Sequence, residues 1–101
     1  MNNETPASMA RFKKIIKALD REHAIDVLLE VARHGATFST VRDDLDLNPS
    51  TVNRCLDVLV DAGLVTRGDK PRLGVTVSLD TTPMGLYIVS LATDIDNGWL
   101  S

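Results

Sequence analysis

Hydrophobic residues recur every three or four positions along most of this chain, and they alternate with polar residues in one short segment. The first spacing is typical of amphipathic helices, and the second is typical of a half-buried strand. The pattern predicts five helices, with a β-hairpin between the fourth and the fifth. The fold class that we expect is therefore mainly α with a small β-hairpin (α+β).

The first two helices are predicted near the N-terminus. Ser8 can cap a helix over residues 9–19, and Asp20 can cap a second helix that runs to about Arg33. Gly35 is expected to end it, because glycine tolerates the left-handed conformation. The apolar stripe of the first helix comprises Met9, Phe12, Ile15, Ile16 and Leu19. The inner face of the second comprises Ile25, Leu28, Leu29 and Ala32, widened by Val27 and Val31.

Two further helices are predicted between Phe38 and Gly63. Phe38 precedes Ser39 as a hydrophobic residue often precedes an N-cap, which indicates that Ser39 caps the third helix. Asn48 followed by Pro49 predicts the start of the fourth helix, because proline is favoured at the first helical position. Gly63 is expected to stop it. The buried face of this fourth helix comprises Val52, Leu56, Leu59 and Val60.

The hairpin and the last helix complete the pattern. Residues 64–66 and 75–79 are predicted as strands, with Gly68, Pro71 and Gly74 between them as turn residues. Thr82 followed by Pro83 opens a helix to about residue 95 that is apolar on two sides. One side comprises Met84, Tyr87, Ile88, Leu91 and Ile95, and the other comprises Leu86 and Val89.

This order of elements predicts a winged helix-turn-helix with extra N- and C-terminal helices. We expect a disordered tail over residues 1–7, one winged-helix domain over 8–95 and a C-terminal tail over 96–101. Within the domain the parts are the N-terminal helix (8–19), the helix-turn-helix (39–63), the wing hairpin (64–80) and a dimerisation helix (82–95). Such a fold presents one helix that fits the major groove of DNA.

Composition narrows the possible functions. The chain of 101 residues suits one domain, and no apolar run approaches the ~20 residues that span a bilayer. Without the apolar segment of a signal peptide we expect a cytoplasmic protein with no membrane partner. Cys55 is the only cysteine, which excludes an intrachain disulfide or a zinc site built of cysteines. No catalytic set is evident, so we expect no enzyme activity, metal, cofactor or small-molecule ligand.

The net charge of −3 leaves an alternative open. DNA affinity comes largely from cations that face phosphates, yet residues 40–80 contain five cations and seven acids. A winged helix that contacts only other proteins, as an assembly module, is therefore the alternative to a DNA-binding protein. The charge of one face nevertheless matters more than the total.

Residues 47–67, LNPSTVNRCLDVLVDAGLVTR, resemble the recognition-helix region of the HxlR and MarR groups of prokaryotic transcriptional regulators. Apolar positions, Gly63 and the final Leu64-Val65-x-Arg67 match the HxlR pattern without a gap, and Phe38-Ser39 matches its upstream opening. Thr82-Pro83-Met84-Gly85 is similar to the start of that group's dimerisation helix. The resemblance implies a dimeric regulator that binds double-stranded DNA sequence-specifically, with Met84, Tyr87, Ile88, Leu91 and Ile95 at the interface between two copies.

The candidate DNA-binding residues lie on the polar side of the helix-turn-helix and at the tip of the wing. Arg54 and Asn53 have side chains suited to base edges, and Lys70 and Arg72 are suited to phosphates. The alternative interpretation is a solvated helix face and a charged hairpin tip. The full set is Ser39, Thr40, Asn48, Ser50, Thr51, Asn53, Arg54, Lys70 and Arg72.

Overall fold

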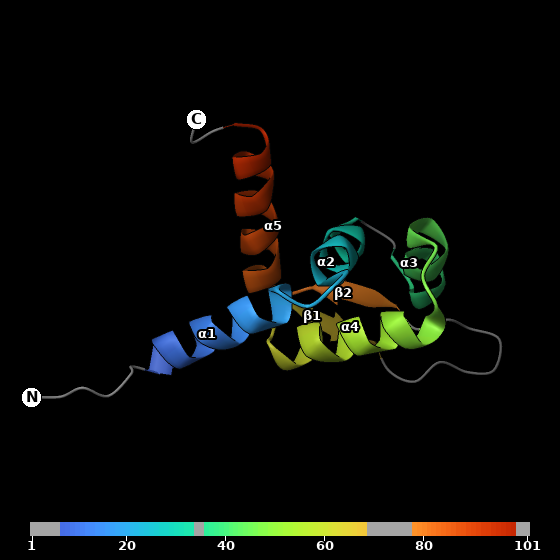
Figure 1. Cartoon of the computed structure of the whole chain (residues 1–101), viewed down its shortest axis with the longest axis horizontal. Coiled ribbons are helices and arrows are strands. Elements are labelled where there is room, and N and C mark those ends of the chain that lie inside the picture. Colours follow the sequence, from blue (N-terminus) through green and yellow to red (C-terminus); the bar gives the residue numbers. More distant parts are fainter. Residues whose placement is uncertain (1–6, 34–35, 69–77, 99–101) are drawn as a thin grey trace, which may run out of the picture.

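The computed structural model describes residues 7–33, 36–68 and 78–98, which form five helices and two strands (Figure 1). Their order is the one that the hydrophobic pattern predicts. In chain order the elements are α1 (Ala7–Leu19), α2 (Ala24–Ala32), α3 (Phe38–Leu45), α4 (Pro49–Asp61), β1 (Val65–Arg67), β2 (Leu79–Thr81) and α5 (Pro83–Asp96). Ala7, expected in the tail, is already helical, whereas the remaining tail residues 1–6 lie outside the described part.

The core is formed where α2 packs against α4, with α1, α3 and β1 around them. Burial of these aliphatic side chains supplies most of the driving force for folding. The largest fully buried side chains are those of Leu28, Leu56, Leu59, Leu64, Val27, Val31, Val41, Val52 and Val65. Among the residues expected on the buried face of α4, Val60 is the exception, since it is exposed.

The start of α2 differs from the expectation that Asp20 caps it. Residues 20–23 form a turn in which the Arg21 nitrogen donates to the Ala18 carbonyl and the Ala24 nitrogen donates to the Arg21 carbonyl. His23 has a left-handed φ of 70° and stands as the N-cap without a side-chain cap bond. The Asp20 nitrogen donates to the Ile16 carbonyl over 3.0 Å, so Asp20 belongs to the C-terminal end of α1 and lies too early in the chain to cap α2. Gly35, the expected stop, lies outside the described residues, and α2 already ends at Ala32.

The buried face of α2 is also rotated from the expected one. Ala24, Val27, Leu28 and Val31 are buried, whereas Ile25 and Leu29 are exposed. Because α2 is apolar over more than half of its circumference, spacing alone could not decide which side faces α4. Ile25 and Leu29 instead face a groove shared with α1 and α5.

The hairpin is antiparallel and pairs Val65 with Thr81 and Arg67 with Leu79. The first strand lies one residue later than expected, and the second covers Leu79–Thr81 in place of residues 75–79. Ser78 forms an isolated bridge to Thr37, just before α3. The predicted residues 75–77 lie outside the described part.

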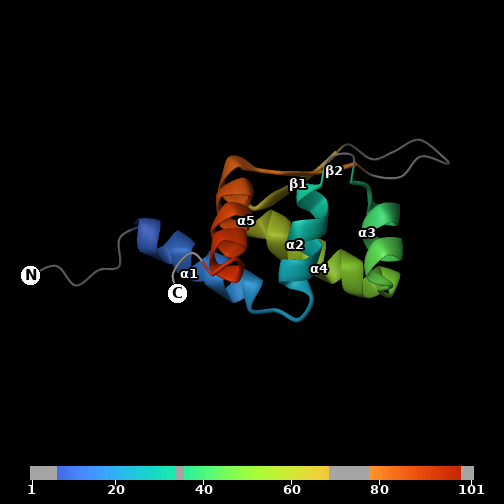
Figure 2. The same cartoon turned by 90° about the horizontal axis from the view of Figure 1, so that it is seen from above.

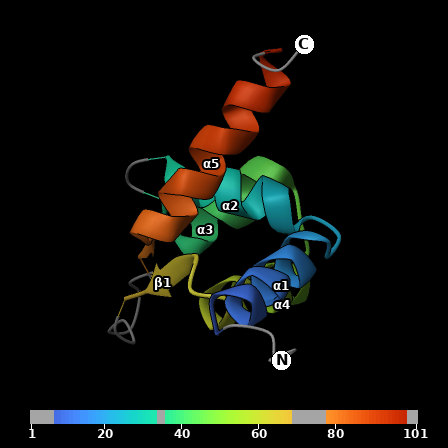
Figure 3. The ribbon, with the colours of Figure 1, turned by 90° about the vertical axis from the view of Figure 1, so that its left-hand side faces the viewer.

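The first turn of α5 is fixed against the connection between α4 and β1. The Thr82 hydroxyl donates to the Gly63 carbonyl over 2.6 Å, and the Thr82 nitrogen donates to the Leu64 carbonyl over 3.1 Å. Gly85 packs so closely on Leu64 that a Cβ there would collide with the Leu64 carbonyl oxygen. From this fixed start α5 projects away from the side on which α4 lies (Figure 1; Figure 3).

Candidate nucleic-acid interface

α4 lies along the edge of the molecule opposite to the free end of α5, and α3 stands beside its N-terminal end (Figure 1; Figure 2). The predicted cap and stop of α4 are confirmed. Asn48 is the N-cap, Pro49 is the first helical residue, and Gly63 follows the helix with a φ of 79°. Because Val52, Cys55, Leu56 and Leu59 are buried, the opposite side of α4 is the one left to solvent.

The predicted polar residues of α4 lie on this outer side. Ser50, Asn53 and Arg54 are exposed, and Thr51 is half-buried. The Asn48 side-chain oxygen accepts from the Ser50 nitrogen over 2.9 Å and from the Ser50 hydroxyl over 2.7 Å. Asn48 therefore caps the helix, and its oxygen is already occupied before any ligand arrives.

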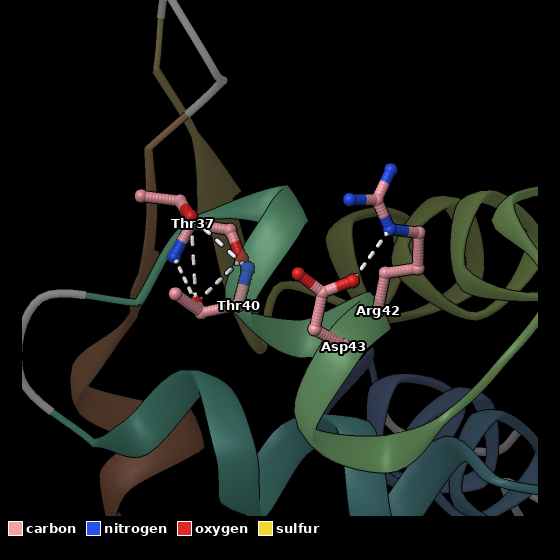
Figure 4. Close-up of polar contacts among 4 residues, drawn as sticks. All are labelled: Thr37, Thr40, Arg42 and Asp43. Carbon is pink, nitrogen blue, oxygen red and sulfur yellow. Dashed lines mark hydrogen bonds and ion pairs between the residues drawn. The ribbon is translucent and has the colours of Figure 1, made fainter.

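The cap of α3 is Thr37, not Ser39 as expected (Figure 4). The Thr40 nitrogen donates to the Thr37 hydroxyl over 3.2 Å, and the Thr37 nitrogen donates to the Thr40 hydroxyl over 2.8 Å. The Thr40 hydroxyl also donates to the Thr37 carbonyl over 2.9 Å, so its hydrogen bonds stabilise the N-terminal cap of α3. The sequence signal for this reciprocal arrangement is a threonine at both the cap position and three residues later. Ser39 is half-buried in the first turn.

Ion pairs neutralise part of the acidic charge that the sequence places near α4. Arg67 of β1 reaches Asp57 over 2.9 Å, and Lys14 of α1 reaches Asp61 over 3.1 Å. On α3, Arg42 pairs with Asp43 over 3.0 Å (Figure 4). No ion pair involves Arg54 among the described residues. The C-terminal half of α4 is thus nearly neutral, and Arg54 gives its N-terminal half a net positive charge.

Arg67 is a site residue to which the sequence pattern assigned no role. Besides Asp57, its guanidinium contacts the Asn53 carbonyl oxygen over 3.3 Å. β1 is in this way connected to the middle of α4, which fixes the hairpin relative to the exposed residues of the helix. The only sequence signal for Arg67 is its place in the Leu-Val-x-Arg ending that matches the HxlR pattern.

The two predicted wing residues, Lys70 and Arg72, lie outside the described residues. Over the described ranges, no group of three His, Cys, Asp or Glu side chains is placed to hold a metal ion. None of the described helices is both long enough and apolar enough to cross a membrane.

Comparison with family models gives a match to the MarR family over residues 19–72. This range starts at the end of α1 and contains α2, α3, α4 and β1, so it covers the helix-turn-helix completely. The chain belongs to the MarR family. Among curated proteins, no sequence matches it.

Solved structures agree with this MarR-family fold. HlyU from Vibrio cholerae superposes with a TM-score of 0.76 at 17% identity, covering 90% of this chain and 97% of HlyU. The homodimeric winged helix-turn-helix DNA-binding domain Mb0332 from Mycobacterium bovis superposes with a TM-score of 0.74 at 17% identity. The match covers 100% of this chain and 94% of the Mb0332 domain. A MarR protein from Peptoclostridium difficile superposes with a TM-score of 0.69 at 13% identity, and the match covers 99% of this chain and 74% of that protein.

The winged helix-turn-helix predicted from the hydrophobic pattern is therefore confirmed. As a MarR-family protein the chain is a DNA-binding transcriptional regulator of bacterial type and is not an enzyme. The resemblance to the MarR group is confirmed, whereas the finer likeness to the HxlR group stays a prediction.

Proposed function

We propose that this MarR-family regulator reads its operator with the first two turns of α4. The observation that carries the proposal is the exposed N-terminal half of a capped helix, with Arg54 free of any described carboxylate partner. Arginine can donate two hydrogen bonds to guanine, and asparagine can pair with adenine in the same way. Arg54 and Asn53 are accordingly the base-reading candidates.

The remaining polar residues of the site position the protein on the sugar-phosphate backbone. Ser50 and Thr51 stand near the N-terminus of α4, where backbone N–H groups and the helix dipole favour anions. Thr40 takes part in the cap of α3, and Asn48 caps α4. To contact DNA, their side chains would have to form hydrogen bonds with DNA and with the cap groups at the same time. Ser39, Lys70 and Arg72 complete the proposed set.

We further propose that two copies associate through α5, with α1 contributing to the same surface. Large apolar side chains of these helices are exposed in one chain, among them Phe12 (53%), Tyr87 (63%) and Ile95 (51%). They surround an apolar groove between α1, α2 and α5, which also contains Met84, Ile88 and Leu91. Contiguous exposed apolar surface of this kind typically marks an interface.

Two-fold pairing would place one recognition helix on each side of the dimer axis. Each would then enter one of two successive major grooves of a nearly palindromic operator. A prokaryotic regulator of this type would act on chromosomal DNA, so we place it in the cytoplasm.

Selection from random duplex DNA tests this function. The full chain is used to enrich duplexes over several rounds at low and at moderate salt, and the bound pool is sequenced. We expect a shared, nearly palindromic motif that persists at the higher salt. Binding without any motif, or no binding at either salt, would support the protein-contact alternative.

A further inference from the structure

A small polar hollow lies between the α1–α2 turn and α4, on the side of α4 opposite to the hairpin. It has a volume of about 210 Å³ and is lined by residues of two segments. The turn supplies Arg21, Glu22 and His23, and the helix supplies Thr51, Arg54 and Cys55. Apart from Arg54 and Thr51, none of these residues belongs to the DNA-binding surface described above.

One hydrogen bond joins the turn to α4, and an ion pair joins the preceding helix α1 to α4. The buried Cys55 thiol donates to the Glu22 carbonyl oxygen over 3.4 Å, and Lys14 pairs with Asp61 farther along α4. Burial raises the pKa of the Cys55 thiol, the positive charge of Arg21 lowers it and the negative charge of Glu22 raises it, so the charges of Arg21 and Glu22 both lie near this part of α4. The hollow is thus formed by two connected elements.

The charges around the hollow favour an anion. Arg21 and Arg54 are both exposed, and over the described ranges neither has a carboxylate within ion-pair distance. The acidic residue of the hollow, Glu22, extends into solvent and approaches the His23 ring over 3.6 Å. The Thr51 hydroxyl, for which the described residues offer no hydrogen-bond partner, is a further donor.

The position of the hollow indicates which anion it meets. Figures 2 and 3 place β1 and β2 on one side of α4 and the α1–α2 turn on the other. A helix in the major groove lies between two sugar-phosphate strands that flank the groove. If the wing follows one strand, the turn faces the other.

We propose that Arg21 and the Thr51 hydroxyl bind a backbone phosphate of operator DNA in this hollow, across the major groove from the wing. Arg54 borders the same hollow and adds its positive charge, while its guanidinium reaches toward the bases. The proposal rests on the proposed function, because it requires α4 to lie in the major groove. It adds the α1–α2 turn to the DNA-binding surface.

The test compares the salt dependence of operator binding for wild type, Arg21→Ala and Lys17→Ala, with a duplex chosen by the selection described above. A phosphate contact contributes about 0.9 to the slope of log affinity against log salt, so we expect Arg21→Ala to reduce the slope by about one. At 0.1 M salt the corresponding loss is about five- to tenfold, equal for operator and scrambled duplexes. Lys17→Ala removes the same charge outside the hollow and should leave the slope unchanged.

A second variant tests the same site by a gain of affinity. Removing the Glu22 carboxylate with Glu22→Gln takes away a negative charge near the bound phosphate, so binding should tighten about two- to fivefold at low salt. Reduced binding by Glu22→Gln would contradict the proposal, as would an unchanged slope for Arg21→Ala. If wild type binds no duplex, the proposed function itself fails, which is a different result.

The anion in the hollow could be a backbone phosphate of DNA or a free phosphate ion, and titration with inorganic phosphate distinguishes the two. Titration of the free protein, followed by the NMR signals of the arginine side chains, should give no saturation below 10 mM, on the order of the weak affinity of single exposed contacts. Saturation at lower phosphate together with an unchanged DNA slope would show a site for free anions and would overturn the proposal.

Discussion

At the scale of single residues, Arg54 has the most direct role in the proposed reading of DNA. It is the cation of α4, it is exposed, and no described carboxylate neutralises it. We expect Arg54→Ala to weaken operator binding by about 1–3 kcal/mol and to relax the preference at one base position. Thermal stability should change by no more than about 0.5 kcal/mol, as for most surface substitutions.

Fluorescence anisotropy with the operator and with single-base variants measures both effects of Arg54→Ala. Ser90→Ala, an exposed change on α5, is the matched control, and it should bind as wild type does. The base-reading role would be wrong if Arg54→Ala kept the full preference of wild type at every position.

Glu30 is the buried carboxyl group of α2, and it predicts a pH dependence of stability. A hydrogen bond with the Asp44 side chain raises the pKa of Glu30, burial raises it further, and Arg33 lowers it in part. As pH rises above the ordinary value of about 4.5, the unfolded chain therefore loses this proton before the native state does. The contribution of Glu30 to stability is full below that pH and is lost as pH rises through the native pKa.

We expect Glu30→Gln to be more stable than wild type at pH 7, with the difference shrinking as the pH falls toward 4. Urea unfolding followed by circular dichroism at several pH values measures this. Asp26→Asn, which changes an exposed carboxylate of the same helix, should show no such gain. A Glu30→Gln effect that is constant over this pH range would contradict the assignment.

At the scale of elements, the start of α5 depends on Gly85. Replacing glycine by alanine inside a helix normally stabilises it by about 1 kcal/mol. Here the added Cβ would meet the Leu64 carbonyl oxygen, which is backbone and cannot easily move. We expect Gly85→Ala to lower the free energy of unfolding by about 1–3 kcal/mol, as overpacking does.

Urea unfolding at one fixed protein concentration tests this effect, because association would change the apparent stability. Ser90→Ala is again the control, and it should be neutral or slightly stabilising. A Gly85→Ala variant as stable as wild type would show that α5 does not need this close contact.

The elements that the sequence predicted well are those fixed by local chemistry. Asn48-Pro49, Gly63 and Thr82-Pro83 mark helix ends through caps that involve only neighbouring residues, and all three are confirmed. The start of α2 was not predictable, because the turn before it is held by a contact between Glu22 and Cys55 of α4.

The same distinction holds for the candidate site. Helical spacing was sufficient to predict that Ser50, Asn53 and Arg54 lie outside the core. The pairing of Arg67 with Asp57 joins two elements, so no local pattern indicates it, and it required the fold. The face of α2 was likewise decided by packing, because that helix offers more apolar surface than its neighbours cover.

At the scale of the whole molecule, the exposed side chains of α5 predict association. Light scattering after size exclusion should give wild type about twice the chain mass of 11.0 kDa at micromolar concentration. We expect Leu91→Asp to be monomeric, because it places an unpaired charge in an apolar interface. Ser90→Asp adds the same charge at the neighbouring polar position and should stay dimeric.

A wild-type mass near that of one chain would rule out α5 as an interface between copies at that concentration. A dimeric mass that Leu91→Asp leaves unchanged would show that the copies associate through another surface.

We propose that two copies joined through α5 place their α4 helices in successive major grooves. Affinity for the selected operator, measured as a function of the distance between its half-sites, tests this most directly. Half-sites bound by such a dimer lie about 34–36 Å apart, which is one helical turn. Inserting five base pairs at the centre turns them to opposite faces, so we predict affinity no better than that for one half-site. Unchanged affinity after the insertion would show that the two α4 helices do not bind adjacent half-sites as a rigid pair.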